Sequence, residues 1–329
     1  MTYDIIVATY NGENYLQQQL MSLLNQTVLP EHIFIRDDLS NDKTIAIIED
    51  FANSAHVPVV FLKPDRNLGY IKNFEVLSKK ALADIIFFCD QDDIWLSNKA
   101  ELIIQEFKTN PECKMIFSDA YLVDEKLDMI STLWHSIGFK PKREECNLSR
   151  VISDNFVTGA TIAIERNYLL SLLPFPDNII HDYWLAVNSI VDNNIFYIEE
   201  KLILYRQHQF NQIGVKNKGF LSKAFNYYSK AKVLDRMNYG KNKLLLIREL
   251  LRRRPELTCD DTIVEYVLYC SFLNKIYGGA YSGLFFSNEL KACLNSGKKS
   301  YSFMSYLRKR RFKNLVLDFF DFAFFLFLK

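Results

Sequence analysis

Three carboxylates within four positions are the first feature of this 329-residue chain that could do chemistry. Asp90, Asp92 and Asp93 directly follow an apolar run at residues 85–89, and Trp95 comes two residues after them. Negative charges this close together are unfavourable unless a cation or protons share the site. We therefore expect Asp90 and Asp92 to hold a divalent cation beside a phosphate-bearing ligand. The spacing leaves open a solvated acidic turn that caps the next helix.

The apolar run before these carboxylates is typical of a parallel strand covered on both faces, because it is continuous rather than alternating. Three similar runs come earlier in the chain, and a helical pattern follows each of them. Strands are expected at residues 3–8, 32–36, 57–62 and 84–89, and helices at 13–25, 43–54 and 70–81. Alternating strands and helices with right-handed crossovers predict an α/β fold, in which a parallel sheet has helices on both faces.

Polar side chains follow the first two strands as well as the fourth. Thr9 and Asn11 come after the first strand, and Asp37 and Asp38 come after the second. The carboxyl ends of parallel strands meet at one edge of a sheet, which is where open α/β sheets bind their ligands. We therefore expect these side chains and the acidic cluster to converge on one site.

Four motifs at these strand ends and turns together resemble family 2 glycosyltransferases, which have the GT-A fold and use nucleotide-diphosphate sugars. The motifs are VATYNG at 7–12, RDDLSNDKT at 36–44, NLG at 67–69 and DQDD at 90–93. A lone Asp-x-Asp motif is a weak signal, but four motifs in this order are a strong one.

Three later motifs are similar to the bacterial rhamnosyltransferase-like branch of that family. They are TGAT at 158–161, HDYWLA at 181–186 and LYRQH at 204–208. Many family members carry Glu-Asp where this chain has His181-Asp182. The resemblance spans residues 3–212 and implies a Rossmann-like, mostly parallel sheet flanked by helices.

The resemblance also implies catalytic roles. Asp182 matches the family's general base, and a single base opposite the leaving diphosphate gives inversion at the anomeric carbon. Asp92 would ligate Mn²⁺ or Mg²⁺, and His208 would complete the metal shell, which favours Mn²⁺. From the residues alone, Asp182 could instead cap its helix, and His208 could be a surface histidine.

Five residues are implied to bind the sugar donor. Thr9 and Asn11 would line the nucleotide pocket, and Asp38 would accept a hydrogen bond from the base. Asn67 would shape the neighbouring loop, and Asp90 would contact the ribose or another part of the nucleotide. Turn chemistry alone is the alternative explanation for Asn11 and Asn67.

The motifs stop near residue 214, which predicts a GT-A domain at 1–214 and a helical region at 215–329. Residues 124–150 are polar and are expected to form a loop. The basic cluster at 307–313 and the aromatic stretch after it are typical of a helix lying at a membrane interface. That stretch is shorter than a membrane span and holds two aspartates. It could instead pack on the catalytic domain or on a partner in a homo-oligomer.

Composition bounds the setting in which such an enzyme would work. The net charge of +1 gives no basic field for nucleic acid, and the six cysteines show no zinc-site spacing. Residues 1–7 lack the features of a signal peptide. We therefore expect a cytoplasmic protein, peripheral on the inner face of the cell membrane.

The favoured donor is dTDP-rhamnose, with UDP-sugars as alternatives, and the expected acceptor is a lipid-linked cell-surface polysaccharide. A metal-dependent phosphohydrolase is the main competing enzyme class, but its Asp-x-Asp-x-Thr pattern near the first strand is absent. No GxGxxG follows the first strand, which argues against a dinucleotide oxidoreductase. A non-catalytic membrane scaffold is the remaining alternative, and nothing in the sequence supports it.

Overall fold

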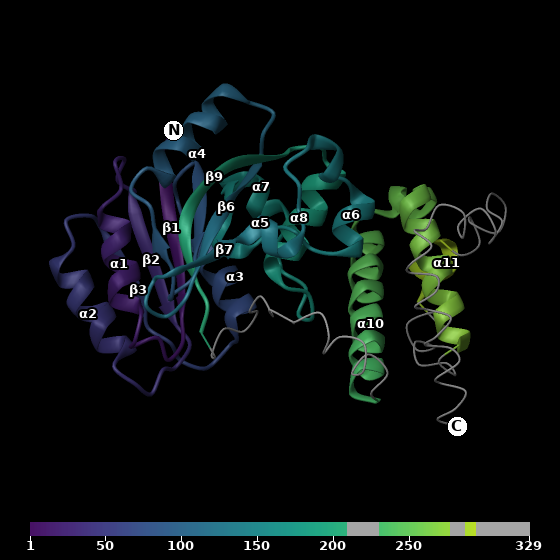
Figure 1. Cartoon of the computed structure of the whole chain (residues 1–329), viewed down its shortest axis with the longest axis horizontal. Helices are drawn as coiled ribbons and strands as arrows, with labels where there is room; N and C mark the ends of the chain where they lie inside the picture. Colours follow the sequence, from purple (N-terminus) through teal and green to yellow (C-terminus); the bar gives the residue numbers. More distant parts are fainter. Residues whose placement is uncertain (209–229, 277–286, 294–329) are drawn as a thin grey trace. The chain divides into compact units, whose positions relative to one another are not determined.

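A computed structural model describes residues 1–208, 230–276 and 287–293 of the chain (Figure 1). The chain divides into two compact units, Met1–Val215 and Lys216–Lys329. The assignment of catalysis to the first part of the chain and of membrane association to its end stays a prediction.

The first unit is built on a sheet of nine strands within the described residues, in the order β3-β2-β1-β4-β8-β6-β9-β5, with β7 beside β6. The strands are β1 (Tyr3–Thr9), β2 (His32–Asp37), β3 (Val59–Leu62), β4 (Ile85–Cys89), β5 (Ile94–Trp95), β6 (Met115–Val123), β7 (Met129–Thr132), β8 (Ala163–Glu165) and β9 (Ile195–Arg206). Strands β3, β2, β1 and β4 run parallel, as do β6 and β9, whereas β8 is antiparallel to both of its neighbours. The predicted mostly parallel α/β sheet is confirmed.

Helices cover both faces of the parallel part, as its continuous apolar strands require. Every residue of β4 is buried. Helices α1 (Leu16–Leu24) and α2 (Thr44–Ser54) lie on one face, and α3 (Tyr70–Lys80) and α8 (His181–Val191) lie on the other (Figure 1). Each helix turns an apolar stripe toward the sheet; α3 buries Phe74 and Leu77, for example. Burial of such side chains contributes about 25 cal/mol per Å² of apolar surface.

The expected loop at 124–150 is wrong, because this segment holds short regular elements. After β7 come α5 (Leu133–Ile137), a 3₁₀ turn at Arg143–Glu145 and α6 (Leu148–Ser153). Trp134 is buried and packs edge-on against Phe139, whose ring stacks on Phe156. Helices of five or six residues are too short to show a periodic pattern in the sequence.

The segments that carry the later motifs lie around β8 and β9. Residues 155–164 include a 3₁₀ turn at Gly159–Thr161, which is followed by the short β8 and then by α7 (Arg166–Ser171). The LYRQH motif begins within one long strand, β9, whose pairing with β6 shifts register after Ser118. Helix α4 (Lys99–Thr109) packs beside β9.

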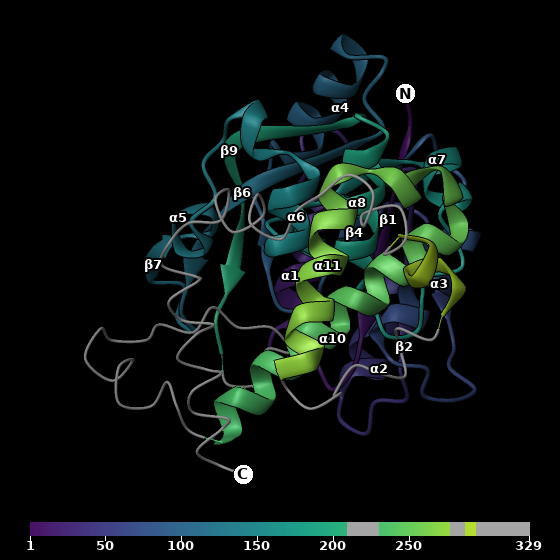
Figure 2. The same cartoon turned by 90° about the vertical axis from the view of Figure 1, so that its right-hand side faces the viewer.

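The second unit is helical where it is described. It contains α10 (Lys230–Arg253), a 3₁₀ turn at Pro255–Cys259 and α11 (Asp261–Ile276), and residues 288–293 are helical as well. Helices α10 and α11 lie side by side (Figures 1 and 2). No described helix is both long and apolar enough to cross a membrane. The predicted interfacial tail at 308–329 lies outside the described residues.

Candidate active site

The carboxyl ends of β1, β2 and β4 lie at one edge of the sheet, as the strand order predicts. Thr9 pairs with Asp37 across β1 and β2, and Val7 pairs with Cys89 across β1 and β4. The loops that leave these strands carry Asn11, Asp38 and the acidic cluster. Residues far apart in the sequence therefore meet here.

Gln91 joins the first and fourth strand ends, a role that the sequence analysis missed. Its side-chain amide accepts from the Tyr10 amide at 2.8 Å and donates to the Tyr10 carbonyl at 3.0 Å. A Cβ atom at Gly12 would lie 2.5 Å from Oε1 of Gln91, so a larger residue there would displace the Gln91 side chain. Gln91 and Gly12 thus form one joint between the nucleotide-side loop and the acidic strand end.

The predicted nucleotide residues Thr9 and Asn11 belong to a hydrogen-bonded loop. The Thr9 hydroxyl donates to Asp37 at 2.9 Å and is buried. The Asn11 amide donates to the Ser40 hydroxyl at 2.8 Å, and its side-chain oxygen accepts from the Asn41 amide at 3.0 Å. Asn11 has φ +47°, a left-handed conformation that Asn adopts more readily than most residues.

Asp38 and Asn67 hold the adjoining loop together. Both oxygens of the buried Asp38 carboxylate accept backbone amides, from Leu68 at 2.6 Å and from Gly69 at 2.8 Å. The Asn67 side chain donates to the Asp38 carbonyl at 2.9 Å, and the Arg36 guanidinium lies 3.5 Å from the carboxylate. Asp38 therefore has an observed structural role in addition to its predicted contact with the base.

Asp90 and Asp182 come together although 92 positions separate them in the sequence. Burial raises the pKa of Asp90 to about 7, and the nearby Asp92 and Asp182 charges add to the rise. Burial also raises the pKa of the Tyr70 hydroxyl, and the negative charges of Asp182 and Asp90 reinforce it. The structure thus gathers the predicted base and the predicted donor-binding carboxylate into one partly desolvated cluster.

Asp182 is fixed by the loop that carries the TGAT motif. It is the second residue of α8, and its carboxylate accepts the Gly159 amide at 3.1 Å and the Asn155 side chain at 3.2 Å. Burial raises the pKa of Asp182 to about 7, and these hydrogen bonds oppose the rise. The carboxylate is held by a neighbouring loop, which a helix cap alone does not explain.

His181 packs beside Asp182 without taking part in hydrogen bonding. Its ring stacks on Phe88 and packs on Phe74, and neither ring nitrogen has a partner among the described residues. Burial lowers the pKa of His181 to about 3, so the ring is neutral. A Cβ atom at Gly159 would lie 2.9 Å from Nε2 of His181, so the small residues of the TGAT motif make room for this ring.

Asp93 separates from its neighbours Asp90 and Asp92. It is 1% exposed, and one carboxylate oxygen accepts the Arg206 amide at 3.1 Å. Burial raises the pKa of Asp93, and the negative charges of Asp92 and Asp90 raise it further. Asp93 is therefore buried against the end of β9 and is not a solvated side chain.

His208 faces Asp92, as the metal hypothesis requires. Its Nε2 atom lies 2.9 Å from Oδ2 of Asp92, and its side chain is 5% exposed, so it is not a surface histidine. Two ligands about 2.1 Å from one cation and at right angles to each other would lie about 3 Å apart. The pair therefore fits neighbouring positions around a cation, and oxygen with imidazole suits Mn²⁺.

Arg206 contacts the groups around the Asp92–His208 pair, a role that the sequence did not reveal. Its guanidinium donates to the Asp92 carbonyl at 2.9 Å and to Gln18 at 2.8 Å. It also lies over the Tyr15 ring, which packs on the His208 ring at 4.7 Å. Across the described ranges, no three His, Cys, Asp or Glu side chains form a ligand group by themselves. A cation here would need further oxygen ligands from a donor or from water.

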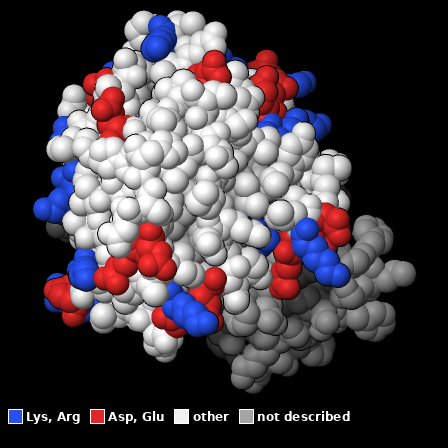
Figure 3. Space-filling model, turned by 90° about the vertical axis from the view of Figure 1, so that its left-hand side faces the viewer, with Lys and Arg blue, Asp and Glu red and all other residues white. Residues whose placement is uncertain are grey.

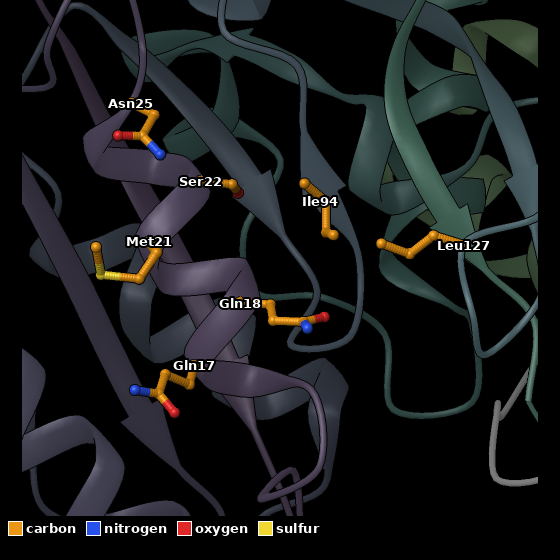
Figure 4. A pocket seen from close by; sticks show the side chains of 7 residues that line it. All are labelled: Gln17, Gln18, Met21, Ser22, Asn25, Ile94 and Leu127. Atoms are coloured by element: carbon orange, nitrogen blue, oxygen red, sulfur yellow. The ribbon is translucent and has the colours of Figure 1, made fainter.

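A hollow of 490 Å³ opens beside this support, between α1 and the turn after β6 (Figure 4). Its lining is uncharged and consists of Gln17, Gln18, Met21, Ser22, Asn25, Ile94 and Leu127. The side of the unit that carries α1 and α2 shows a wide area without charged side chains, with Lys, Arg, Asp and Glu around its margins (Figure 3). Two lining residues connect the hollow to the site, because Ile94 follows Asp93 in the chain and Gln18 accepts from Arg206.

Comparison with known proteins places this geometry in a family. Residues 4–172 match the family model described as "Glycosyl transferase family 2". The chain is 31% identical over 223 residues to "dTDP-rhamnosyl transferase RfbG" of Shigella flexneri, covering 63% of this chain and 73% of that protein.

A second relative differs in its sugar. The chain is 24% identical over 191 residues to "UDP-Glc:alpha-D-GlcNAc-diphosphoundecaprenol beta-1,3-glucosyltransferase WfgD" of Escherichia coli, covering 58% of this chain and 70% of that protein. Among solved structures, S. aureus TarS 1-349 in complex with UDP-GlcNAc has a TM-score of 0.57 at 18% identity, covering 90% of this chain and 79% of that one. The likeness to TarS concerns the fold alone.

Proposed function

Because this chain belongs to glycosyl transferase family 2 and is a glycosyltransferase, we propose that it is a metal-dependent inverting enzyme. It would transfer a sugar, with rhamnose favoured, from a nucleotide-diphosphate donor to a lipid-linked cell-surface polysaccharide. The observation that carries the proposal is the meeting of a loop-held Asp182 with Asp90 and the Asp92–His208 pair at one edge of the sheet.

Asp182 acts as the general base in this mechanism. A base is most effective when its pKa is close to the working pH, and that of Asp182 is raised to about 7. The ionised carboxylate takes the proton of an acceptor hydroxyl, whose oxygen attacks the anomeric carbon from the face opposite the diphosphate. One displacement of this kind inverts the configuration at that carbon.

The other predicted residues bind and orient the donor. Asp92 and His208 would hold the cation, which when bound neutralises the charge that develops on the leaving diphosphate. Asp90 contacts the nucleotide. The loops that carry Thr9, Asn11, Asp38 and Asn67 form the nucleotide pocket.

The relatives support the proposed substrates by their printed activities. The rhamnosyltransferase relative favours dTDP-rhamnose, and the glucosyltransferase relative keeps a UDP-sugar as the alternative. The diphosphoundecaprenol acceptor of the latter supports a lipid-linked acceptor here. A peripheral position on the inner membrane face, with residues 308–329 at the interface, would bring the enzyme to such an acceptor.

A donor screen tests the proposal. The full chain is incubated with dTDP-rhamnose and a series of UDP-sugars, with Mn²⁺ or with EDTA, and both thermal shift and release of nucleoside diphosphate are measured. We expect one donor to raise the melting temperature and to be turned over only with the cation. Absence of metal-dependent release from every donor would sink the proposal, and phosphate release from simple phosphate esters would favour the phosphohydrolase.

The tail is tested separately with a variant that lacks residues 308–329. If the tail lies at the membrane, the truncated enzyme should lose binding to vesicles that contain anionic lipid but keep donor turnover. Unchanged vesicle binding would show that the tail packs elsewhere.

A further inference from the structure

Lys99 is a buried cation in the first unit to which the mechanism above gives no role. It is the first residue of α4 and is 0% exposed. Its ammonium lies 3.6 Å from the centre of the Trp95 ring. Taking an ammonium out of water is unfavourable without compensation, so the contacts of Lys99 indicate what it does.

The ammonium of Lys99 bonds to the backbone of the TGAT loop. It donates to the Ala160 carbonyl at 2.8 Å. A charged donor makes a stronger hydrogen bond than a neutral one, and stronger still where water is excluded. Lys99 is therefore a firm tether on one carbonyl of this loop.

That carbonyl belongs to the turn that holds the proposed base. Ala160 follows Gly159 in the 3₁₀ turn, and the Gly159 amide donates to Asp182 at 3.1 Å. The rest of the turn is braced as well, because Ile162 accepts the Phe88 amide from β4 at 3.1 Å. Lys99 and Asp182 thus form hydrogen bonds to consecutive residues of the same turn.

Burial and the acidic neighbours of Lys99 act in opposite directions on its charge, and burial has the larger effect. Burial lowers the pKa of Lys99 to about 7, and the negative charges of Asp93 and Asp90 oppose part of this shift. When Lys99 is protonated, its positive charge offsets part of the repulsion among these carboxylates.

We propose that Lys99 is a positioning residue for sugar transfer: its ammonium fixes the Ala160 carbonyl and so sets the Gly159 amide that orients Asp182. This inference rests on the proposed role of Asp182 as general base. Misplacement of a catalytic group by about 1 Å can lower a rate by about 10²-fold. Loss of the tether should therefore lower turnover far more than it weakens donor binding.

The test compares Lys99→Met with wild type in the full chain. We expect kcat for nucleoside diphosphate release to fall about 30- to 100-fold while KM for the donor stays within about threefold. The acid limb of the kcat profile should move to higher pH, since a weaker Gly159 hydrogen bond lets the pKa of Asp182 rise. Asn155, Asp90 and Tyr70 also face Asp182 and are unchanged in this variant.

Two further variants separate positioning from general damage. Lys108→Met removes an exposed lysine from the same helix and should leave kcat and the acid limb unchanged. Lys99→Arg keeps a charged donor and should recover most of the turnover. If Lys99→Met does not fold, Lys99→Gln is measured in the same way, because its shorter amide keeps a donor but not the charge.

Hydrogen exchange tests the tether without any turnover. Amides of residues 158–162 should exchange faster in Lys99→Met than in wild type, while those of β1 stay protected. If wild type releases no nucleoside diphosphate from any donor, the proposed function fails, yet exchange still tests the tether. Unchanged exchange in this loop, or a wild-type kcat and acid limb in folded Lys99→Met, would overturn the inference.

Discussion

The nucleotide-side loops and the carboxylate cluster both bury polar side chains, but their hydrogen bonding differs. In the loops, both oxygens of Asp38 accept backbone amides and Arg36 lies beside them. In the cluster, Asp90, Asp93 and Asp182 all have raised pKa values, and one oxygen of Asp93 has no partner among the described residues. The polar groups of the loops have hydrogen-bond partners within the protein, whereas the carboxylates of the cluster repel one another in the absence of a ligand.

This difference separates the parts that stabilise the fold from the parts that perform the reaction. Charges on the loop side should stabilise the protein, and removing them should weaken it. Charges in the cluster should destabilise the empty protein and become favourable when a cation and donor are bound. The variants below test this contrast, beginning with the largest expected effect.

Asp182→Asn should abolish most of the activity without weakening the fold. Loss of a general base lowers kcat by about 10²- to 10⁴-fold. Because the variant removes a desolvated charge but keeps the shape, its melting temperature at pH 8 should equal or exceed that of wild type. The matched control is Asp177→Asn, which changes a carboxylate that is 78% exposed just before α8. A strongly destabilised Asp182→Asn would contradict the view that charges in the cluster destabilise the empty protein.

Gly159→Ala should lower kcat by about 10²-fold, because the new Cβ would lie 2.9 Å from His181 Nε2 and push the turn away from Asp182. Steady-state kinetics and circular dichroism together show whether the loss comes from geometry or from unfolding. The double variant Gly159→Ala/His181→Ala relieves the contact and should recover part of kcat. No recovery would mean that His181 is not the obstacle.

Lowering the pH should inactivate wild type through Asp182, by about tenfold per pH unit below a pKa of about 7. The effect on stability has the opposite sign. The folded pKa lies above the ordinary aspartate value of 3.8, so the folded state binds the proton more tightly, and this contribution to stability is lost as pH rises from about 4 to 7. Urea unfolding across this range should show a steeper fall for wild type than for Asp182→Asn.

Asp38→Asn should have the smallest effect on kcat but should weaken the fold by about 1–3 kcal/mol, since it leaves the buried Arg36 without its nearest buried carboxylate. The urea midpoint measures this loss. Asp65→Asn is a stringent control, because Asp65 also lies 3.5 Å from Arg36 but is 81% exposed. Equal loss in both variants would contradict a special role for the buried pair.

The sequence was informative where long periodic patterns met polar strand ends. Continuous apolar runs predicted β1, β2 and β4, and their parallel order predicted that Asp38, Asp90 and the first loop would lie at one edge. The separation of Asp93 from Asp90 and Asp92 could not be predicted, because it depends on an amide of Arg206, 113 positions away.

Other features had no readable signal. The supporting roles of Gln91, Lys99 and Arg206 come from side-chain contacts across the fold. The positions of these residues in the sequence do not predict such contacts. The short helices between β7 and β8 lack periodicity, and the small residues at 158–161 do not reveal which groups approach their backbone. The structure identifies those neighbours as the His181 ring and the Lys99 ammonium.

The joint between Gln91 and Tyr10 has a consequence for engineering donor choice. Position 12 tolerates only glycine while Gln91 occupies its present place, and Gln91 in turn sits between two aspartates of the acidic cluster. A mutant library that varies the first loop alone would therefore contain many sequences in which the loop cannot pack against Gln91. Positions 10–12 and 91 should therefore be varied together in the same library.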